Sequence, residues 1–297
     1  MSVIPEDFLR GPASAAKVHL IDFEKTTPPI PAFKNSFAAV VDNLLSPEEC
    51  NELLVLAEQS TTEPSKWERA LINVGNGKQV MSVNSRKSGR IIWDSSEIAE
   101  RLLARLMPYM RDFGIEHVQN QPMVTGLGPA RRGEVMHLSR LNERLRFLRY
   151  EGGDYFRPHW DGCYVTPDGK EKSLFTIHLY LNGEGEQDMD ELMPEIERAE
   201  KRNFLFAQDG EVDLMDLQDT GDADQPIATT QGPLLGGATS FTDSYKTKAA
   251  VRVFPRAGSV LIFQQRDLLH GGDDVFRGIK YTVRTDVMYT TENPNQS

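Results

Sequence analysis

The spacing of hydrophobic residues predicts two helices in the first third of the chain. The first follows Ser46-Pro47-Glu48-Glu49, a capping box with proline at the first helical position. The second is predicted from about Ser96, and Pro108 is expected to bend or end it. Apolar residues recur at helical spacing in both, namely Leu53, Leu54, Leu56 and Ala57, then Ile98, Leu102, Leu103 and Leu106.

From Leu141 onward the pattern changes to short strands separated by turns. The strands are predicted at 146–150, 155–161, 173–181, 238–241, 251–254, 259–263 and 280–289, with an earlier one at 37–41. In the third of these, Leu174, Thr176, His178 and Tyr180 share one face. Helices followed by about eight short strands predict an α+β fold that is mainly β. We expect a double-stranded β-helix (jelly roll) core with the N-terminal helices packed on one face.

Two segments stand apart from this core. Residues 1–35 are predicted to be an N-terminal extension that wraps the domain or stays mobile, and 36–297 to be the domain itself. An acidic insertion at 183–226 interrupts the β-rich region, with an amphipathic helix predicted at Met189–Phe206 and a polar loop at 207–226. It is either a lid over a site or a solvated insertion.

Charge and cysteine content restrict the partners. The net charge is -11, but residues 183–224 carry fifteen acidic against three basic residues, so the rest is nearly neutral. Without a basic stripe, nucleic acid is not expected as a partner. Cys50 and Cys163 form no disulfide framework, and no apolar segment suggests a signal or membrane span. We expect a cytoplasmic location, with the nucleus left open and the oligomeric state undetermined.

Candidate chemistry centres on His159-Trp160-Asp161. On a strand, side chains alternate between faces, so His159 and Asp161 can reach one metal while Trp160 points away. His270, beside Gly271-Gly272, can supply a second imidazole. Two histidines and one carboxylate leave coordination positions open, as oxygen chemistry at Fe(II) requires. His-x-Asp alone also arises by chance among surface residues, so this prediction depends on its surroundings.

Ten residues after His270, Lys280 begins an apolar strand. A buried cation there needs a partner, and the distal carboxylate of a dicarboxylic keto acid can provide it. Arg284 lies four residues further along the same face and can make the same contact bidentately. The spacing from His270 favours Lys280, and Arg284 remains the alternative.

Several segments occur in an order that resembles prolyl 4-hydroxylase-like Fe(II)/2-oxoglutarate-dependent dioxygenases. They are Arg149 to Asp161 (RYEGGDYFRPHWD), Tyr180-Leu181-Asn182, Gly236 to Phe241 (GGATSF), Pro255 to Phe263, and the spacing of His270 and Lys280. The resemblance covers about 140–289, and more loosely 37–60. The long acidic insertion departs from the compact members of the family, which places the family's substrates in doubt for this chain.

The resemblance implies roles for individual residues. His159, Asp161 and His270 would bind Fe(II), and Lys280 and Tyr180 would hold the distal carboxylate of 2-oxoglutarate. Tyr150 would line the keto-acid pocket, and Gly236 and Gly237 would begin the strand that carries Thr239. The implied activity is an oxidoreductase that uses O2, releases succinate and CO2, and hydroxylates an unactivated C–H bond, with ascorbate as a reductant.

The substrate is the weakest part of the prediction. The resemblance points to a prolyl residue of a peptide, free proline, or a related amino acid or small molecule. Arg157 is expected on the face of His159 and Asp161, where it meets substrate or is a solvated rim charge; His178 is expected to be a hydrogen-bonded core histidine. The alternatives are an oxygenase acting on a secondary metabolite and a non-catalytic jelly-roll module that binds metal or 2-oxoglutarate.

Overall fold

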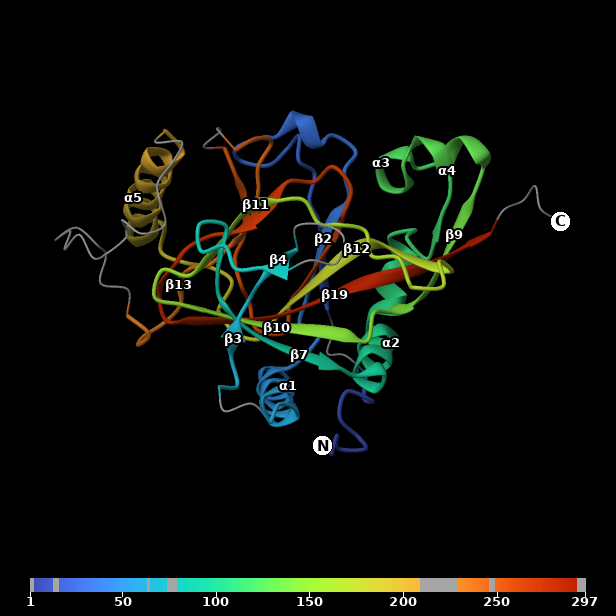
Figure 1. Ribbon diagram of the computed structural model, residues 1–297, viewed down its shortest axis with the longest axis horizontal. Helices are drawn as coiled ribbons and strands as arrows, with labels where there is room; N and C mark the ends of the chain where they lie inside the picture. Colours follow the sequence, from blue (N-terminus) through green and yellow to red (C-terminus); the bar gives the residue numbers. More distant parts are fainter. Residues whose placement is uncertain are drawn as a thin grey trace.

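The computed structural model describes residues 3–12, 16–62, 65–73, 79–208, 229–245 and 249–292. Within them, two antiparallel sheets pack together (Figure 1). In the larger sheet the strands lie in the order β1 (Lys17–Leu20), β2 (Ala38–Asp42), β16 (Val260–Gln264), β12 (Glu171–Tyr180), β19 (Ile279–Glu292), β10 (Arg144–Glu151), β7 (Gly89–Asp94) and β3 (Glu68–Arg69). Strand β9 (Val135–Leu141) also pairs with β19, and β8 (His117–Val118) pairs with β9. The smaller has the order β15 (Val251–Val253), β14 (Thr239–Phe241), β17 (His270–Gly272), β11 (Tyr155–His159), β6 (Arg86–Lys87).

The connections between the sheets make a jelly roll. From β10 to β19 the chain crosses repeatedly between them, with β16, β12, β19 and β10 adjacent in the larger sheet and β15, β14, β17 and β11 in the smaller. Two short ribbons flank this core, β13 (Leu235–Gly236) with β18 (Val275–Arg277), and β4 (Ile72–Asn73) with β5 (Gln79–Val80). The predicted fold class is therefore confirmed.

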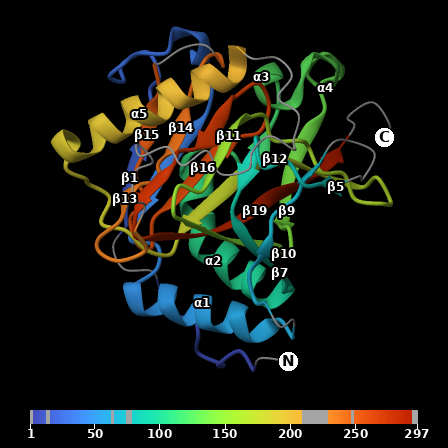
Figure 2. The same cartoon turned by 60° about the vertical axis from the view of Figure 1, so that its left-hand side comes forward.

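Helices α1 (Pro47–Ser60) and α2 (Ser96–Asp112) cover the outer face of the larger sheet (Figures 1 and 2). The predicted capping box at Ser46 and Glu49 is present in full. Buried Leu53 and Leu106 belong to the same apolar core as Phe147 and Val283 of the sheet. Helix α2 does not end at Pro108 but continues to Asp112, because a proline in the last turn removes little of the hydrogen-bond ladder.

The described residues before position 36 pack on the rest of the fold. Strand β1 pairs with β2, and Phe23, Ile30 and Phe33 join the core between the sheets. On the other side, Arg101 and Arg105 of α2 donate hydrogen bonds to backbone carbonyls of residues 5–11. These segments are thus held by both sheet pairing and buried polar contacts.

Helix α5 (Met189–Gln208) confirms the helix expected in the acidic insertion. It lies on the opposite side of the sheets from α1 (Figures 1 and 2) and packs Leu192 and Ile196 against Leu235 and Phe276. The predicted loop that follows lies mostly outside the described residues. Helices α3 (Pro122–Thr125), α4 (Leu127–Arg132) and a 3-10 turn at Pro31–Phe33 complete the fold. None of the helices in the described ranges is long and apolar enough to cross a membrane.

Candidate metal centre

Two neighbouring strands of the smaller sheet bring the predicted metal ligands together. His159, the last residue of β11, is the register partner of His270, the first residue of β17. Asp161 follows just beyond the end of β11, and Trp160 between them is exposed. The Nε2 atoms of His159 and His270 lie 3.8 and 3.6 Å from the Asp161 carboxylate. One potential ligand atom from each residue falls within 4.8 Å of the others.

A bulge in β11 changes which side chains face this site. Between Phe156 and His159 the strand advances three residues while β17 advances two, next to Pro158, which cannot donate to the ladder. Phe156 therefore stacks on His159, with ring centroids 3.6 Å apart. The expectation that strict alternation would put Arg157 on the His159 face was wrong. Its guanidinium lies over the Tyr155 ring and forms a two-point ion pair with buried Asp274.

The two imidazoles are oriented so that their Nε2 atoms are free for a metal. His159 Nδ1 donates to the carbonyl of Arg157 at 2.9 Å, and His270 Nδ1 donates to that of Leu268 at 3.0 Å. This is the usual way in which a metal-binding histidine has its tautomer fixed. His270 Nε2 is fully buried and has no hydrogen-bond partner among the described residues. Because a buried polar atom without a partner is costly, the donor set fits a divalent metal.

The protonation states also suit a metal. Burial, reinforced by nearby His270, lowers the pKa of His159 to about 3, and burial lowers the pKa of His270 as well. Burial opposes ionisation of Asp161, but Arg284 and the two histidines hold the pKa of that carboxyl well below its usual range. The centre therefore presents two neutral imidazoles and one carboxylate near neutral pH, which is the ligating form of each.

Both oxygens of the Asp161 carboxylate are held by neighbours. Thr176 donates to Oδ2 at 2.6 Å, and Arg284 Nη2 lies 2.8 Å from Oδ1. Arg284 also lies 3.2 Å from buried Asp286, which in turn pairs with Arg146. The period-two pattern that put Lys280, Thr282 and Arg284 on one face extends to Asp286, so its position on the site face could have been inferred from the sequence.

Lys280 occupies a different position from Arg284. It is 3% exposed, and its ammonium lies 5.1 Å from the Tyr150 ring centroid and 5.8 Å from that of Tyr180. It forms no ion pair with a carboxylate of the described residues, and burial lowers its pKa to about 8. The Tyr180 hydroxyl donates to Thr239 at 2.8 Å. At Gly237 a Cβ atom would lie 3.1 Å from Lys280 Cδ, so the backbone approaches the lysine closely there.

The remaining histidines have distinct surroundings. His178 shares the inner face with Tyr180, 6.3 Å from His270 between ring centroids, and makes no hydrogen bond to any described residue, unlike the core histidine expected. His117 and His137 face each other across β8 and β9, with their Nδ1 atoms 2.9 Å apart, at a partly exposed edge. The sequence indicated no role for this pair.

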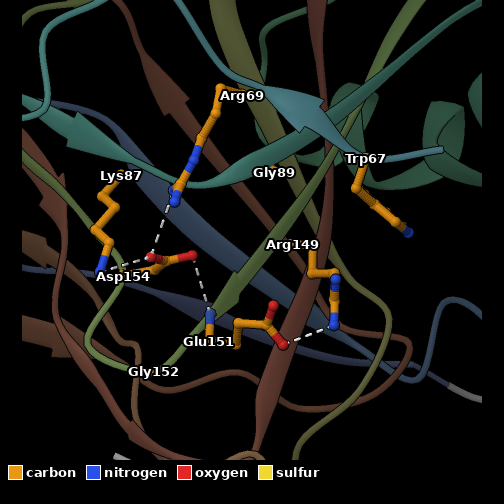
Figure 3. A pocket seen from close by; sticks show the side chains of 8 residues that line it. All are labelled: Trp67, Arg69, Lys87, Gly89, Arg149, Glu151, Gly152 and Asp154. Atoms are coloured by element: carbon orange, nitrogen blue, oxygen red, sulfur yellow. Dashed lines mark hydrogen bonds and ion pairs between the residues drawn. The ribbon is translucent and has the colours of Figure 1, made fainter. Parts of the chain in front are cut away.

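A cavity of about 360 Å³ lies on another part of the molecule (Figure 3). It is lined by Trp67, Arg69, Lys87, Gly89, Arg149, Glu151, Gly152 and Asp154. Its cations point toward carboxylates: Arg69 and Lys87 flank Asp154, and Arg149 pairs with Glu151 (Figure 3). None of the three potential metal ligands lines this cavity, so it is not the candidate metal site.

Comparison with known proteins gives structural likeness only. No family model matches the chain, and no curated protein matches it at a significant level. Among solved structures, it is similar to a viral collagen prolyl hydroxylase from Paramecium bursaria Chlorella virus-1, in a 2-oxoglutarate complex (18% identity, TM-score 0.42, covering 86% of this chain and 97% of that one). It is also similar to a Pseudomonas putida prolyl-4-hydroxylase (15% identity, TM-score 0.45, covering 86% of this chain and 94% of that one). A third similar structure is a Trichoplax adhaerens prolyl hydroxylase bound to a hypoxia inducible factor peptide (12% identity, TM-score 0.45, covering 85% of this chain and 83% of that one).

Proposed function

We propose that this protein is an Fe(II)- and 2-oxoglutarate-dependent dioxygenase. The observation that carries the proposal is the buried Nε2 atom of His270, which has no hydrogen-bond partner among the described residues and lies 3.6 Å from the Asp161 carboxylate beside His159. Three protein ligands on one side of a metal leave room for a chelating keto acid and for O2. Bound there, iron with 2-oxoglutarate and O2 would supply oxidative decarboxylation to succinate and CO2 and hydroxylation of a substrate C–H bond.

The chain's own residues have three tasks in this proposal. His159, Asp161 and His270 hold the metal, and Thr176 and Arg284 fix the rotamer of Asp161. Lys280 neutralises the distal carboxylate of 2-oxoglutarate, supported by Tyr180 and by the ring of Tyr150. Arg284 is assigned to Asp161 rather than to the keto acid, because its guanidinium is already shared between Asp161 and Asp286.

The substrate of the proposed reaction is a prolyl residue, free proline, or a related amino acid or small molecule. This follows from the likeness of the motifs around His159 and Lys280 to those of prolyl 4-hydroxylases. Contact of Arg157 with substrate stays a prediction; its pairing with Asp274 makes it a fixed group rather than a free one. Ascorbate as a reductant also stays a prediction.

The test is formation of succinate from 2-oxoglutarate with Fe(II) and O2. We expect the wild-type chain to form succinate slowly even without substrate, and His159→Ala to abolish it. His137→Ala, which alters the surface histidine pair, should behave as wild type. Equal turnover in His159→Ala would rule out this centre, and binding of metal and 2-oxoglutarate without O2-dependent succinate would indicate a non-catalytic binding module.

A further inference from the structure

Four arginines converge on the inner face of the larger sheet beside the candidate metal centre. Arg146 of β10 is the register partner of Arg284 of β19, and Arg90 of β7 is a diagonal neighbour of Arg146. Arg86 reaches the same region from β6 at the edge of the smaller sheet. Strands β7, β10 and β19, which carry three of them, run side by side in Figure 1.

These arginines outnumber the carboxylates that contact them. Asp286 is shared by Arg146 and Arg284, and Asp161 pairs with Arg284. Arg90 is half-buried and makes no hydrogen bond or ion pair with any described residue; Glu68 is its cross-strand neighbour but lies beyond ion-pair distance. Arg86 donates from Nε to the neutral hydroxyl of Ser88.

Clustering of this kind is unfavourable without an anion. Burial, together with the nearby charges of Arg86 and Arg146, lowers the pKa of Arg90, and burial lowers the pKa of Arg86 and of Arg146. Guanidiniums are nevertheless always charged in proteins, so their mutual repulsion persists in the folded state. An oxyanion bound between them would remove this repulsion and would be recognised bidentately.

The cluster adjoins the candidate metal from two sides. Arg284 touches Asp161 directly, and the Arg86 guanidinium lies 4.5 Å from the Phe156 ring, which stacks on His159. The cluster adjoins the position assigned to the keto acid but uses different cations: Lys280 is the register partner of Tyr150, four residues along β10 from Arg146, and Tyr150 also interacts with Arg86. Two anionic groups can therefore be held near one metal without competing for the same cation.

We propose that the arginine cluster formed by Arg86, Arg90, Arg146 and Arg284 binds an oxyanion group on the substrate, with the direct contacts made by Arg86 and Arg90, which form no ion pair with a carboxylate of the described residues. The proposal rests on the dioxygenase function proposed above and narrows its substrate class to small molecules that carry a carboxylate or phosphate close to the oxidised C–H bond. A free amino acid such as proline meets this requirement through its own carboxylate. A prolyl residue inside a peptide does not, because its carboxyl group is an amide.

The first test measures anion binding directly, independently of turnover. Sulfate is titrated calorimetrically into the full chain, without metal or O2 and with saturating 2-oxoglutarate to occupy its own site. We expect one sulfate to bind, and Arg90→Gln to weaken binding by roughly tenfold or more, as loss of a charge-assisted contact requires. The matched control Arg111→Gln removes an exposed arginine paired with Glu116 and should bind sulfate as wild type.

The folding of Arg90→Gln is checked by thermal unfolding without anion. Since Arg90 has no described partner and is repelled by its neighbours, this variant should unfold at the wild-type temperature or above it. A folded Arg90→Gln protein that binds sulfate as tightly as wild type would overturn the proposal. So would a wild-type chain that binds no sulfate.

The second test distinguishes the two sources of the oxyanion. Amino acids and other small carboxylic acids are compared with their amides, and nucleoside and sugar monophosphates with their unphosphorylated parents, for gain of one oxygen by mass spectrometry. A product from the acid but not the amide identifies a carboxylate, and one from the monophosphate alone identifies a phosphate. If succinate forms but neutral analogues are oxidised equally well, this inference fails while the dioxygenase function stands; if no succinate forms at all, the dioxygenase function itself fails.

Discussion

Several buried polar groups at the candidate site lack a hydrogen bond or a counter-charge among the described residues. His270 Nε2 and Arg284 Nε have no hydrogen-bond partner there, and the Lys280 ammonium has no ion pair and contacts the rings of Tyr150 and Tyr180. By contrast, Asp161, Thr176 and Asp286 are engaged by their neighbours. Unsatisfied buried groups cost free energy in the folded state, so they point to where metal and keto acid would bind.

Lys280 gives a pH-dependent prediction. Burial lowers its pKa to about 8, below that of an exposed lysine, so in the free protein the ammonium deprotonates as pH rises through that value. A carboxylate needs the protonated form. We therefore expect the Kd for 2-oxoglutarate, measured calorimetrically without O2, to be constant below pH 7 and to rise about tenfold per pH unit well above 8.

Replacement of the same lysine tests its role without changing pH. Lys280→Ala should weaken 2-oxoglutarate binding by roughly ten- to a hundredfold at pH 7, the value of a charge-assisted hydrogen bond. Lys170→Ala, whose side chain is 80% exposed, is the control and should bind normally. If the Lys280→Ala protein keeps both wild-type affinity and the rise above pH 8, another group holds the keto acid.

Asp286 gives a stability prediction. It is 2% exposed and is the carboxylate shared by Arg146 and Arg284, so Asp286→Asn leaves two largely buried guanidiniums short of a counter-charge. Breaking a buried pair in this way costs about 3 kcal/mol of unfolding free energy, measurable by urea denaturation. Asp168→Asn on an exposed turn should change little. An unchanged urea midpoint in Asp286→Asn would mean that Asp161 alone balances both arginines.

At the scale of elements, periodicity predicted most strands because one face of each strand is buried in an apolar core. It put Tyr180 on the same face as His178, and Lys280 on the same face as Arg284, and the registers of β10, β12 and β19 agree with both. It failed at β11, where a bulge beside Pro158 shifts the register. Strict alternation predicts that Arg157 lies on the face of His159, but Phe156 lies there instead. It also could not reveal Arg86, because a two-residue strand has no measurable period and its neighbours are distant in sequence.

The turn between β15 and β16 ties the sheet to the start of α1. Gly258 has φ +79°, and a Cβ atom there would lie 1.9 Å from the carbonyl oxygen of Leu45; its own carbonyl accepts hydrogen bonds from Leu44 and Leu45. Gly258→Ala combines left-handed strain with a backbone clash, and we expect it to cost about 3 kcal/mol. Gly11→Ala, with open space around its Cβ, is the control, and equal urea midpoints would contradict this account.

At the scale of the whole molecule, charge is distributed very unevenly. The net charge of -11 arises mainly in the insertion, whereas the inner face beside the metal centre carries an excess of guanidiniums. The charge count of the sequence places the acidic excess at residues 183–224. It did not locate the internal positive cluster, because arginines 86, 90, 146 and 284 are scattered along the chain and meet only through strand pairing.

A metal that binds the native state alone must stabilise the whole domain. At a concentration of about 100 times its Kd, the gain is about 2.7 kcal/mol, which should raise the Tm by roughly 5 °C in a chain of this size. Mn(II) is the convenient ion, since it occupies such a site without iron's oxidation. His270→Ala should abolish the shift, whereas His117→Ala should retain it because that histidine belongs to the edge pair. A shift lost in His117→Ala but kept in His270→Ala would contradict this assignment. Because a stabilising ion acts through its ligands, the metal would then bind at the edge pair and not at His159, Asp161 and His270.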